Sequence, residues 1–102
     1  MRHRHSFRLD RAGHTVQVNI RSGLLTETEL LVDGREVAFR RERGPGALPR
    51  TLSGAHPDLP GEVCLVRIDR PAPGSTALRC ELEYGGRRHP MAVWGTEPRP
   101  SR

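Results

Sequence analysis

The sequence of 102 residues contains no lysine, so all 17 of its basic side chains are arginine. It has only two phenylalanines, one tyrosine and one tryptophan, which excludes a large aromatic core. No apolar run is long enough to cross a membrane, and none follows the first residues, so we expect neither a membrane anchor nor a signal peptide. The only two cysteines, Cys64 and Cys80, lie within apolar segments. We therefore expect buried free thiols in a cytoplasmic protein rather than a disulfide.

Arginine, alanine, glycine and proline are abundant instead. This composition is what a GC-rich coding sequence yields, and we interpret it mainly as codon bias of a bacterial source such as an actinobacterium. The alternative is selection for phosphate or carboxylate recognition, which arginine performs with two hydrogen bonds. A net charge of +5 is compatible with a polyanionic ligand but is common in small domains. The length predicts a single domain over residues 1–96, followed by a flexible tail over 97–102.

Alternation of apolar and polar residues predicts about seven short strands and no helix. The strands are expected at residues 3–9, 14–20, 28–33, 35–40, 62–69, 77–84 and 87–94, the last interrupted by Pro90. Four turn residues, 10–13, separate the first two strands, which predicts a register with Leu9 opposite His14 and Phe7 opposite Val16. This pattern is typical of an antiparallel β-sandwich or a small barrel.

The strongest local signal is the Asp33-Gly34 pair between two apolar runs. Asp-Gly favours a type I′ turn, because both central residues of that turn need a positive φ. The alternation then places Leu30, Val32, Val37 and Phe39 on the core face, with Leu31 and Ala38 on the other. The run from Thr28 to Val37 resembles hairpins of the Fas apoptotic inhibitory molecule family. The resemblance implies a β-sandwich and carries over no function.

The segment over residues 41–61 is rich in glycine and proline and departs from this rhythm. A connection of this length in a compact domain is usually functional or disordered. The alternative is a crossing between two sheets that contains a short strand at residues 50–52.

Metal binding and catalysis find little support in the sequence. His3 and His5 could supply two ligands from one strand face, but no third ligand has suitable spacing, so we expect no metal and no cofactor. Cys64 could pair with a histidine as a nucleophile, yet its apolar neighbours predict an inert thiol. No Gly-x-Ser-x-Gly motif is present. We therefore expect a protein that is not an enzyme.

A second hypothesis is a nucleic-acid-associated protein that binds through an arginine-rich sheet face. The candidate polyanion face consists of Arg4, Arg8, Gln17, Asn19, Arg21, Arg40, Arg41 and Arg43. Arginines on such a face would contact phosphates in a salt-dependent manner. Single strands also need exposed aromatic rings for stacking, and the alternation leaves only Trp94 for that role.

The hypothesis that we favour is a small binding module that associates with a protein partner or with a second copy of itself. Apolar residues assigned to outward faces or to the final edge strand would form an exposed patch of the kind found at interfaces. The candidate interface consists of Leu31, Ala38, Leu65, Met91 and Trp94.

Overall fold

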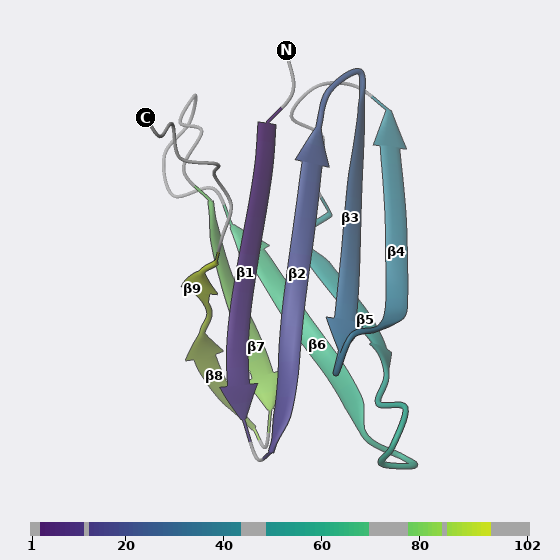
Figure 1. The fold of residues 1–102 in the computed structure, drawn as a ribbon, viewed down its shortest axis with the longest axis vertical. Helices are drawn as coiled ribbons and strands as arrows, with labels where there is room; N and C mark the ends of the chain where they lie inside the picture. Colours follow the sequence, from purple (N-terminus) through teal and green to yellow (C-terminus); the bar gives the residue numbers. More distant parts are fainter. Residues whose placement is uncertain (1–2, 12, 44–48, 70–77, 85, 95–102) are drawn as a thin grey trace.

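The computed structural model describes residues 3–11, 13–43, 49–69, 78–84 and 86–94, and Figure 1 shows their arrangement. These residues form two antiparallel sheets and contain no helix, so the predicted all-β fold is confirmed. None of them forms a helix that could span a membrane. The predicted tail over residues 97–102 lies outside the described residues.

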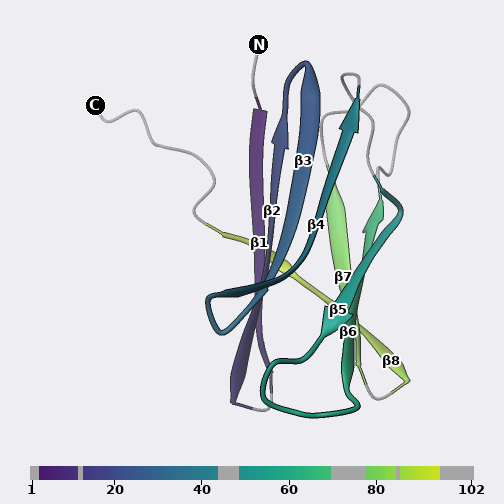
Figure 2. The same cartoon turned by 90° about the vertical axis from the view of Figure 1, so that its right-hand side faces the viewer.

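Sheet A has the strand order β4-β3-β2-β1-β9, and sheet B has the order β5-β6-β7-β8. The strands of sheet A are β1 (His3–Arg11), β2 (His14–Ser22), β3 (Leu25–Val32), β4 (Arg35–Arg43) and β9 (Ala92–Val93). Those of sheet B are β5 (Thr51–Ala55), β6 (Val63–Asp69), β7 (Arg79–Tyr84) and β8 (Arg87–Pro90). Figure 2 shows the two sheets as separate layers that face each other.

The core fills the space between the sheets and is mostly aliphatic, with one buried aromatic ring. Its buried apolar residues are Phe7, Val16, Val18, Ile20, Leu30, Val32, Leu52, Cys64, Val66, Ile68, Cys80, Leu82 and Met91. Both cysteines are free and buried, as predicted. Burial raises the pKa of the Cys80 thiol to about 12, and it also raises the pKa of the Cys64 thiol.

The first hairpin has a register different from the predicted one. Arg11 pairs with His14 and Leu9 with Val16, so the strands extend almost to Gly13, whose φ is +81°. The predicted four-residue turn is therefore wrong, because the strands pair two residues further than expected. A shift of two residues leaves every side chain on its predicted face, since side chains alternate with a period of two.

The Asp33-Gly34 turn has the predicted conformation, with φ angles of +52° and +82°. The strand that leaves it contains a β-bulge that the sequence analysis did not predict. Leu31 pairs with Glu36, but Leu30 pairs with Ala38, so Val37 of β4 has no pairing partner on β3. One extra residue reverses the faces that follow it. Ala38 therefore packs against the core and Phe39 is 44% exposed, which corrects both assignments.

The chain crosses between the sheets twice. The segment over residues 41–61 contains β5 at the edge of sheet B, a strand of five residues where the alternative interpretation placed a short strand at residues 50–52. Residues 44–48 of this segment lie outside the described part. The second crossing follows Pro90, where β8 of sheet B ends and β9 of sheet A begins two residues later. Met91 occupies this corner with its side chain in the core.

Candidate functional site

The surface of sheet A that points away from sheet B is the main candidate site, and we call it the outer face. Figures 1 and 2 show no other strand over it. By strand alternation and pairing, its residues are Arg4, Ser6, Arg8, Asp10, Thr15, Gln17, Asn19, Arg21, Leu25, Glu27, Glu29, Leu31, Glu36, Phe39, Arg41, Arg43, Ala92 and Trp94. It combines arginines, carboxylates, amides and two large aromatic rings.

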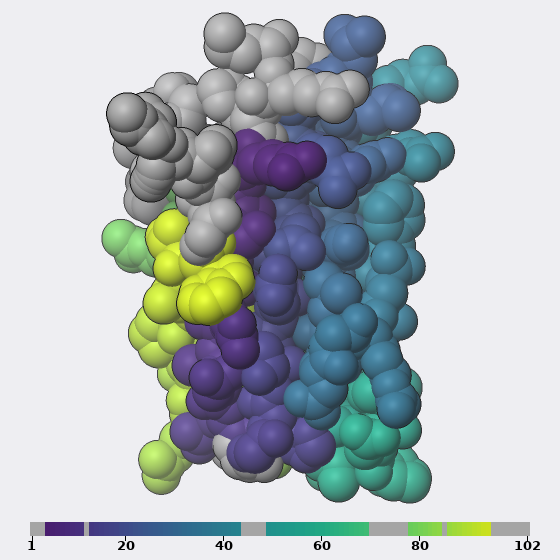
Figure 3. Space-filling view, in the orientation of Figure 1, coloured from purple at the N-terminus to yellow at the C-terminus, as the bar shows by residue number. Residues whose placement is uncertain are grey.

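Trp94 lies at the β9 side of this face. Its backbone N–H donates a hydrogen bond to the Ser6 carbonyl over 2.8 Å, which extends the β1–β9 pairing by one residue. The Arg8 guanidinium carbon lies 4.3 Å from the centre of the Trp94 ring, a distance that gives a cation–π contact. The ring is nevertheless 48% exposed. In Figure 3 the yellow residues near the end of the described chain lie against β1 on this face.

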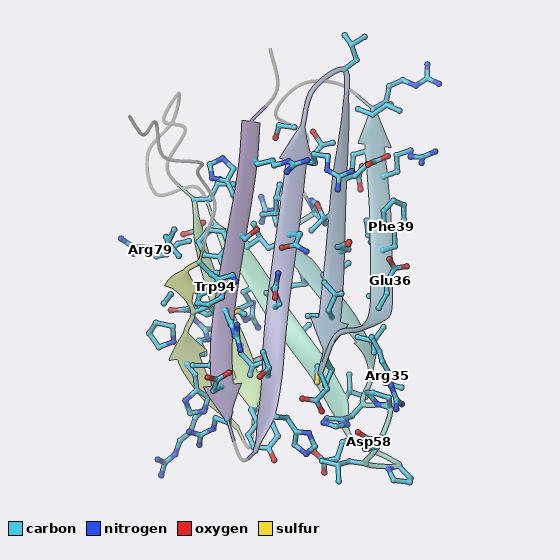
Figure 4. The ribbon with its side chains drawn as sticks, in the orientation of Figure 1. Arg35, Glu36, Phe39, Asp58, Arg79 and Trp94 are labelled. Atoms are coloured by element: carbon cyan, nitrogen blue, oxygen red, sulfur yellow. The ribbon has the colours of Figure 1, made fainter. Side chains whose placement is uncertain are left out.

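Phe39 lies on β4 at the opposite side, as Figure 4 shows together with Trp94. The Arg41 guanidinium is 5.8 Å from the centre of the Phe39 ring. Arg41 also forms an ion pair with Glu27, with 3.1 Å between nitrogen and oxygen. The other carboxylate oxygen of Glu27 lies 3.6 Å from Arg21. A network of two arginines around one carboxylate therefore joins β2, β3 and β4.

Short polar side chains occupy the centre of the outer face. The Asn19 side-chain oxygen accepts hydrogen bonds from the Ser6 hydroxyl over 2.8 Å and from the Gln17 amide over 2.9 Å. Because these side chains are shorter than the arginines around them, the face is hollowed there. The depression has a volume of about 200 Å³, and its lining includes Arg4, Ser6, Asn19, Glu29 and Phe39.

Most of the candidate polyanion residues come together on this face. Arg4, Arg8, Gln17, Asn19, Arg21, Arg41 and Arg43 all project from it. Arg40 does not, because it pairs with the buried Thr28 and shares that residue's side of the sheet, where it contacts Glu42 at 3.0 Å. The bulge in β4 causes this difference, since it reverses the faces of the residues after it.

The candidate interface residues do not form one patch. Leu31 and Trp94 lie on the outer face of sheet A, whereas Leu65 lies on the opposite surface of the molecule, on sheet B. Ala38 packs against the core because of the bulge. Met91 is only 7% exposed because the chain turns inward at the crossing between β8 and β9. The assignment of Ala38 and Met91 to a surface patch is therefore wrong.

The histidines that the sequence suggested as weak metal ligands are not part of a cluster of three or more metal-binding side chains in the described residues. His5 lies on the inner side of β1, and the His3 side chain is outside the described part of the chain. A different group converges where the start of β2, the turn between β3 and β4, and the loop between β5 and β6 meet. His14, Asp33 and Asp58 offer ligand atoms that all lie within 4.8 Å of one another. Sequence analysis missed this group because its members belong to three separate segments.

Asp33 is held firmly within this group. Its carboxylate accepts hydrogen bonds from the His14 Nδ1–H over 2.7 Å and from the Thr15 backbone N–H over 2.9 Å. The hydrogen bond from His14, followed by that from Thr15, lowers the pKa of Asp33 below its usual value. The carboxylate therefore stays ionised under all but strongly acidic conditions.

Comparisons with known proteins define no class for this chain. No family model, no curated protein and no solved structure matches it.

Proposed function

We propose that the protein is a non-enzymatic binding module of the cytoplasm that associates with a protein surface through the outer face of sheet A. One observation carries the proposal: Trp94 and Phe39 remain about half exposed at the two sides of a sheet face over which the described residues place no further strand, and each ring lies beside an arginine. Tryptophan, phenylalanine and arginine are enriched in protein interfaces, and tryptophan and arginine often contribute most of the binding energy. The free thiols of Cys64 and Cys80 suit a reducing compartment.

The charges of the outer face favour a protein partner over a polyanion. Arg8 lies 3.5 Å from Asp10, and Arg21 and Arg41 both contact Glu27. A phosphate that approached these arginines would have to replace an existing carboxylate partner, and it would meet repulsion from Glu27 and Glu29. A protein surface with both signs of charge can instead satisfy arginines and carboxylates together.

A second copy of the chain is the occupant that this face fits. Because the face carries both signs of charge, two copies can offer each other complementary groups across a two-fold axis. The four long strands have eight or nine residues each. At about 3.3 Å per residue and about 4.8 Å between strands, they cover roughly 600 Å² before side-chain relief is included. A standard interface buries about 800 Å² per partner, so the face approaches the required size.

Binding of single-stranded nucleic acid is the second candidate function. The specific observation in its favour is that the bulge turns Phe39 outward, so that two aromatic rings instead of one stand on the face. Rings next to arginines can stack with bases while the guanidinium groups contact phosphates. The carboxylates of Glu27 and Glu29 oppose this mode of binding.

The fluorescence of Trp94 provides the test, because it is the only tryptophan in the chain. We expect its emission to shift to shorter wavelength as protein concentration rises, in parallel with dimer formation in sedimentation equilibrium. Phe39→Ser should weaken dimerisation at least tenfold. The matched control is Val63→Ser, which changes a residue that is 58% exposed on sheet B and should leave dimerisation unchanged.

Two outcomes would contradict the proposal. If the chain stays monomeric at millimolar concentration with unchanged emission, the outer face does not bind a second copy. If single-stranded oligonucleotides quench Trp94 at physiological salt, and the affinity falls steeply as salt is added, the second candidate function replaces the first.

A further inference from the structure

We propose that His14, Asp33 and Asp58 form a binding site for a divalent transition-metal ion of the Zn²⁺ class. The site is distinct from the outer face and lies at the end of the sandwich where the Asp33-Gly34 turn meets the loop between β5 and β6. One imidazole nitrogen and two carboxylates are a ligand set that zinc accepts. Three protein ligands leave a fourth position for water or an anion.

The spacing of the three side chains suits a small ion. Zinc binds nitrogen and oxygen ligands at about 2.0–2.2 Å, so ligand atoms around a tetrahedral ion lie about 3.4 Å apart. His14 Nδ1 and Asp33 Oδ2 are already 2.7 Å apart, and all three ligand atoms lie within 4.8 Å of one another. Zinc would displace the proton that His14 Nδ1 donates to Asp33, and these two ligand atoms would separate from 2.7 Å toward about 3.4 Å while the exposed Asp58 side chain moves in to close the set.

The backbone fixes two of the ligands in advance. The Asp33 N–H donates to the Thr15 carbonyl over 2.8 Å, and the Thr15 N–H donates to Asp33 Oδ1 over 2.9 Å. This pair of bonds joins the turn to β2 and leaves Asp33 Oδ2 directed at His14, the first residue of the same strand. Secondary contacts that orient ligands in this way are typical of metal sites.

His56 gives an independent indication of a ligand at this place. The Asp58 backbone N–H donates to His56 Nδ1 over 3.1 Å, so the neutral ring carries its proton on Nε2. Nε2 is buried and has no hydrogen-bond partner among the described residues, and the whole residue is 7% exposed. The His56 ring stands at 81° to the His14 ring, with 4.5 Å between their centres. Because the two rings are in contact, this unpartnered donor lies beside a ligand residue, and we assign His56 as a supporting residue that would hydrogen-bond to a metal-bound water or anion rather than as a ligand.

Arg35 provides a test in which a substitution is expected to strengthen metal binding. Its guanidinium lies 3.6 Å from Asp58 Oδ1, and Figure 4 shows the two side chains next to each other. The arginine competes with a metal ion for this carboxylate, because both are cations that the same oxygen must bind. Removal of the guanidinium therefore favours the metal.

Calorimetric titration of the full chain with zinc chloride tests the proposal. We expect one ion per chain, at least tenfold weaker binding in both His14→Gln and Asp58→Asn, and at least threefold tighter binding in Arg35→Ala. His5→Gln is the matched control for zinc held by the histidines of β1 and should bind like the parent chain. Thermal unfolding without metal shows whether each variant is folded. Asp58→Asn is the variant least prone to unfold, because Asp58 is exposed and its replacement leaves the His14–Asp33 hydrogen bond in place.

The site predicts a spectroscopic signature as well. Cobalt(II) in place of zinc should give the visible absorption bands of a four- or five-coordinate ion, and Asp58→Asn should weaken them. Zinc binding that is lost in His5→Gln but kept in Asp58→Asn would assign the ion to β1 and overturn the proposal. The proposal is also overturned if neither the parent chain nor Arg35→Ala binds zinc stoichiometrically. In Arg35→Ala the competing guanidinium is gone, so competition cannot explain a lack of binding.

Discussion

The backbone of Gly54 on β5 lies directly against the backbone of Val37 on β4, so closely that a Cβ atom at position 54 would overlap the Val37 carbonyl. Val37 is the extra residue of the bulge in β4. The bulge therefore brings the edge of sheet A toward the edge of sheet B at the position where glycine permits it. This contact links the two sheets on the side opposite the β8–β9 crossing.

Gly54→Ala should destabilise the fold by about 2 kcal/mol, because either β4 or β5 must move to accept the methyl group. Denaturant unfolding followed by circular dichroism measures the effect. Ser53→Ala, at the exposed neighbouring position, is the control and should change stability by less than about 0.5 kcal/mol. Equal stability of the two variants would show that the sheets are not in close contact at this point.

Gly34→Val should destabilise the fold by more than about 1 kcal/mol for a different reason. No atom lies within 4 Å of the position that a Cβ would occupy, so the cost comes only from the φ angle of +82°. Gly34→Asn should cost less, because asparagine tolerates this conformation better than a β-branched residue does. If valine and asparagine have the same unfolding midpoint, the turn is not type I′ in solution.

Stability should decrease as the pH rises above about 9. The pKa of Cys80 is raised from 9.0 to about 12, so the unfolded chain loses the thiol proton first and is favoured between these values. Cys80 alone should lower the free energy of unfolding by about 1 kcal/mol between pH 9 and pH 10, and Cys64 shifts it in the same direction. Because the chain has no lysine, few other side chains titrate in this range.

Cys80→Ala should reduce this pH dependence, even though the smaller side chain lowers stability at neutral pH. The measurement is the slope of unfolding free energy against pH from 8 to 10. If the slope is the same in the variant, the Cys80 thiol loses its proton as easily in the folded protein as in the unfolded chain. That result would contradict the structure, in which Cys80 is only 1% exposed.

Leu31→Glu should weaken self-association by at least about tenfold in Kd while the chain remains folded, since Leu31 lies on the outer face between Gln17 and Glu36. Leu65→Glu on sheet B is the matched control and should not affect association. Sedimentation equilibrium distinguishes the two. If Leu31→Glu unfolds the chain, its face is assigned incorrectly; if both variants dimerise like the parent, the interface lies elsewhere.

The strands and the Asp33-Gly34 turn were predictable because each depends on neighbouring residues alone. Alternation identified β1 to β4, β6 and β7, and the positive φ that the turn requires pointed to Asp-Gly. The single strand expected over residues 87–94 was wrong, because it is two strands, β8 and β9, that belong to different sheets. The predicted register of the first hairpin was wrong by two residues, yet Phe7 and Val16 kept their faces because the error was even. At the bulge in β4 the error was one residue, so Ala38 and Phe39 were each predicted on the wrong face of the sheet.

The candidate sites depended on contacts that local patterns do not contain. The bulge lies where Val37 approaches Gly54, two residues in different sheets, and it turns the Phe39 ring onto the outer face. Met91 looked like part of an exposed final strand, but the corner between β8 and β9 turns it into the core. The group formed by His14, Asp33 and Asp58 exists only because two turns and a loop meet at one end of the sandwich.

The pairing of β9 with β1 has a consequence for the order of events during synthesis. The meander from β1 to β4 needs only pairings between consecutive strands, so it can form while the rest of the chain is still being translated. The contact of Phe7 with Val93, and with it the placement of Trp94 beside Arg8, must wait until β9 has left the ribosome. A nascent chain therefore lacks the β9 side of the outer face until that last step, and the association that we propose for this face would wait until the sandwich is complete.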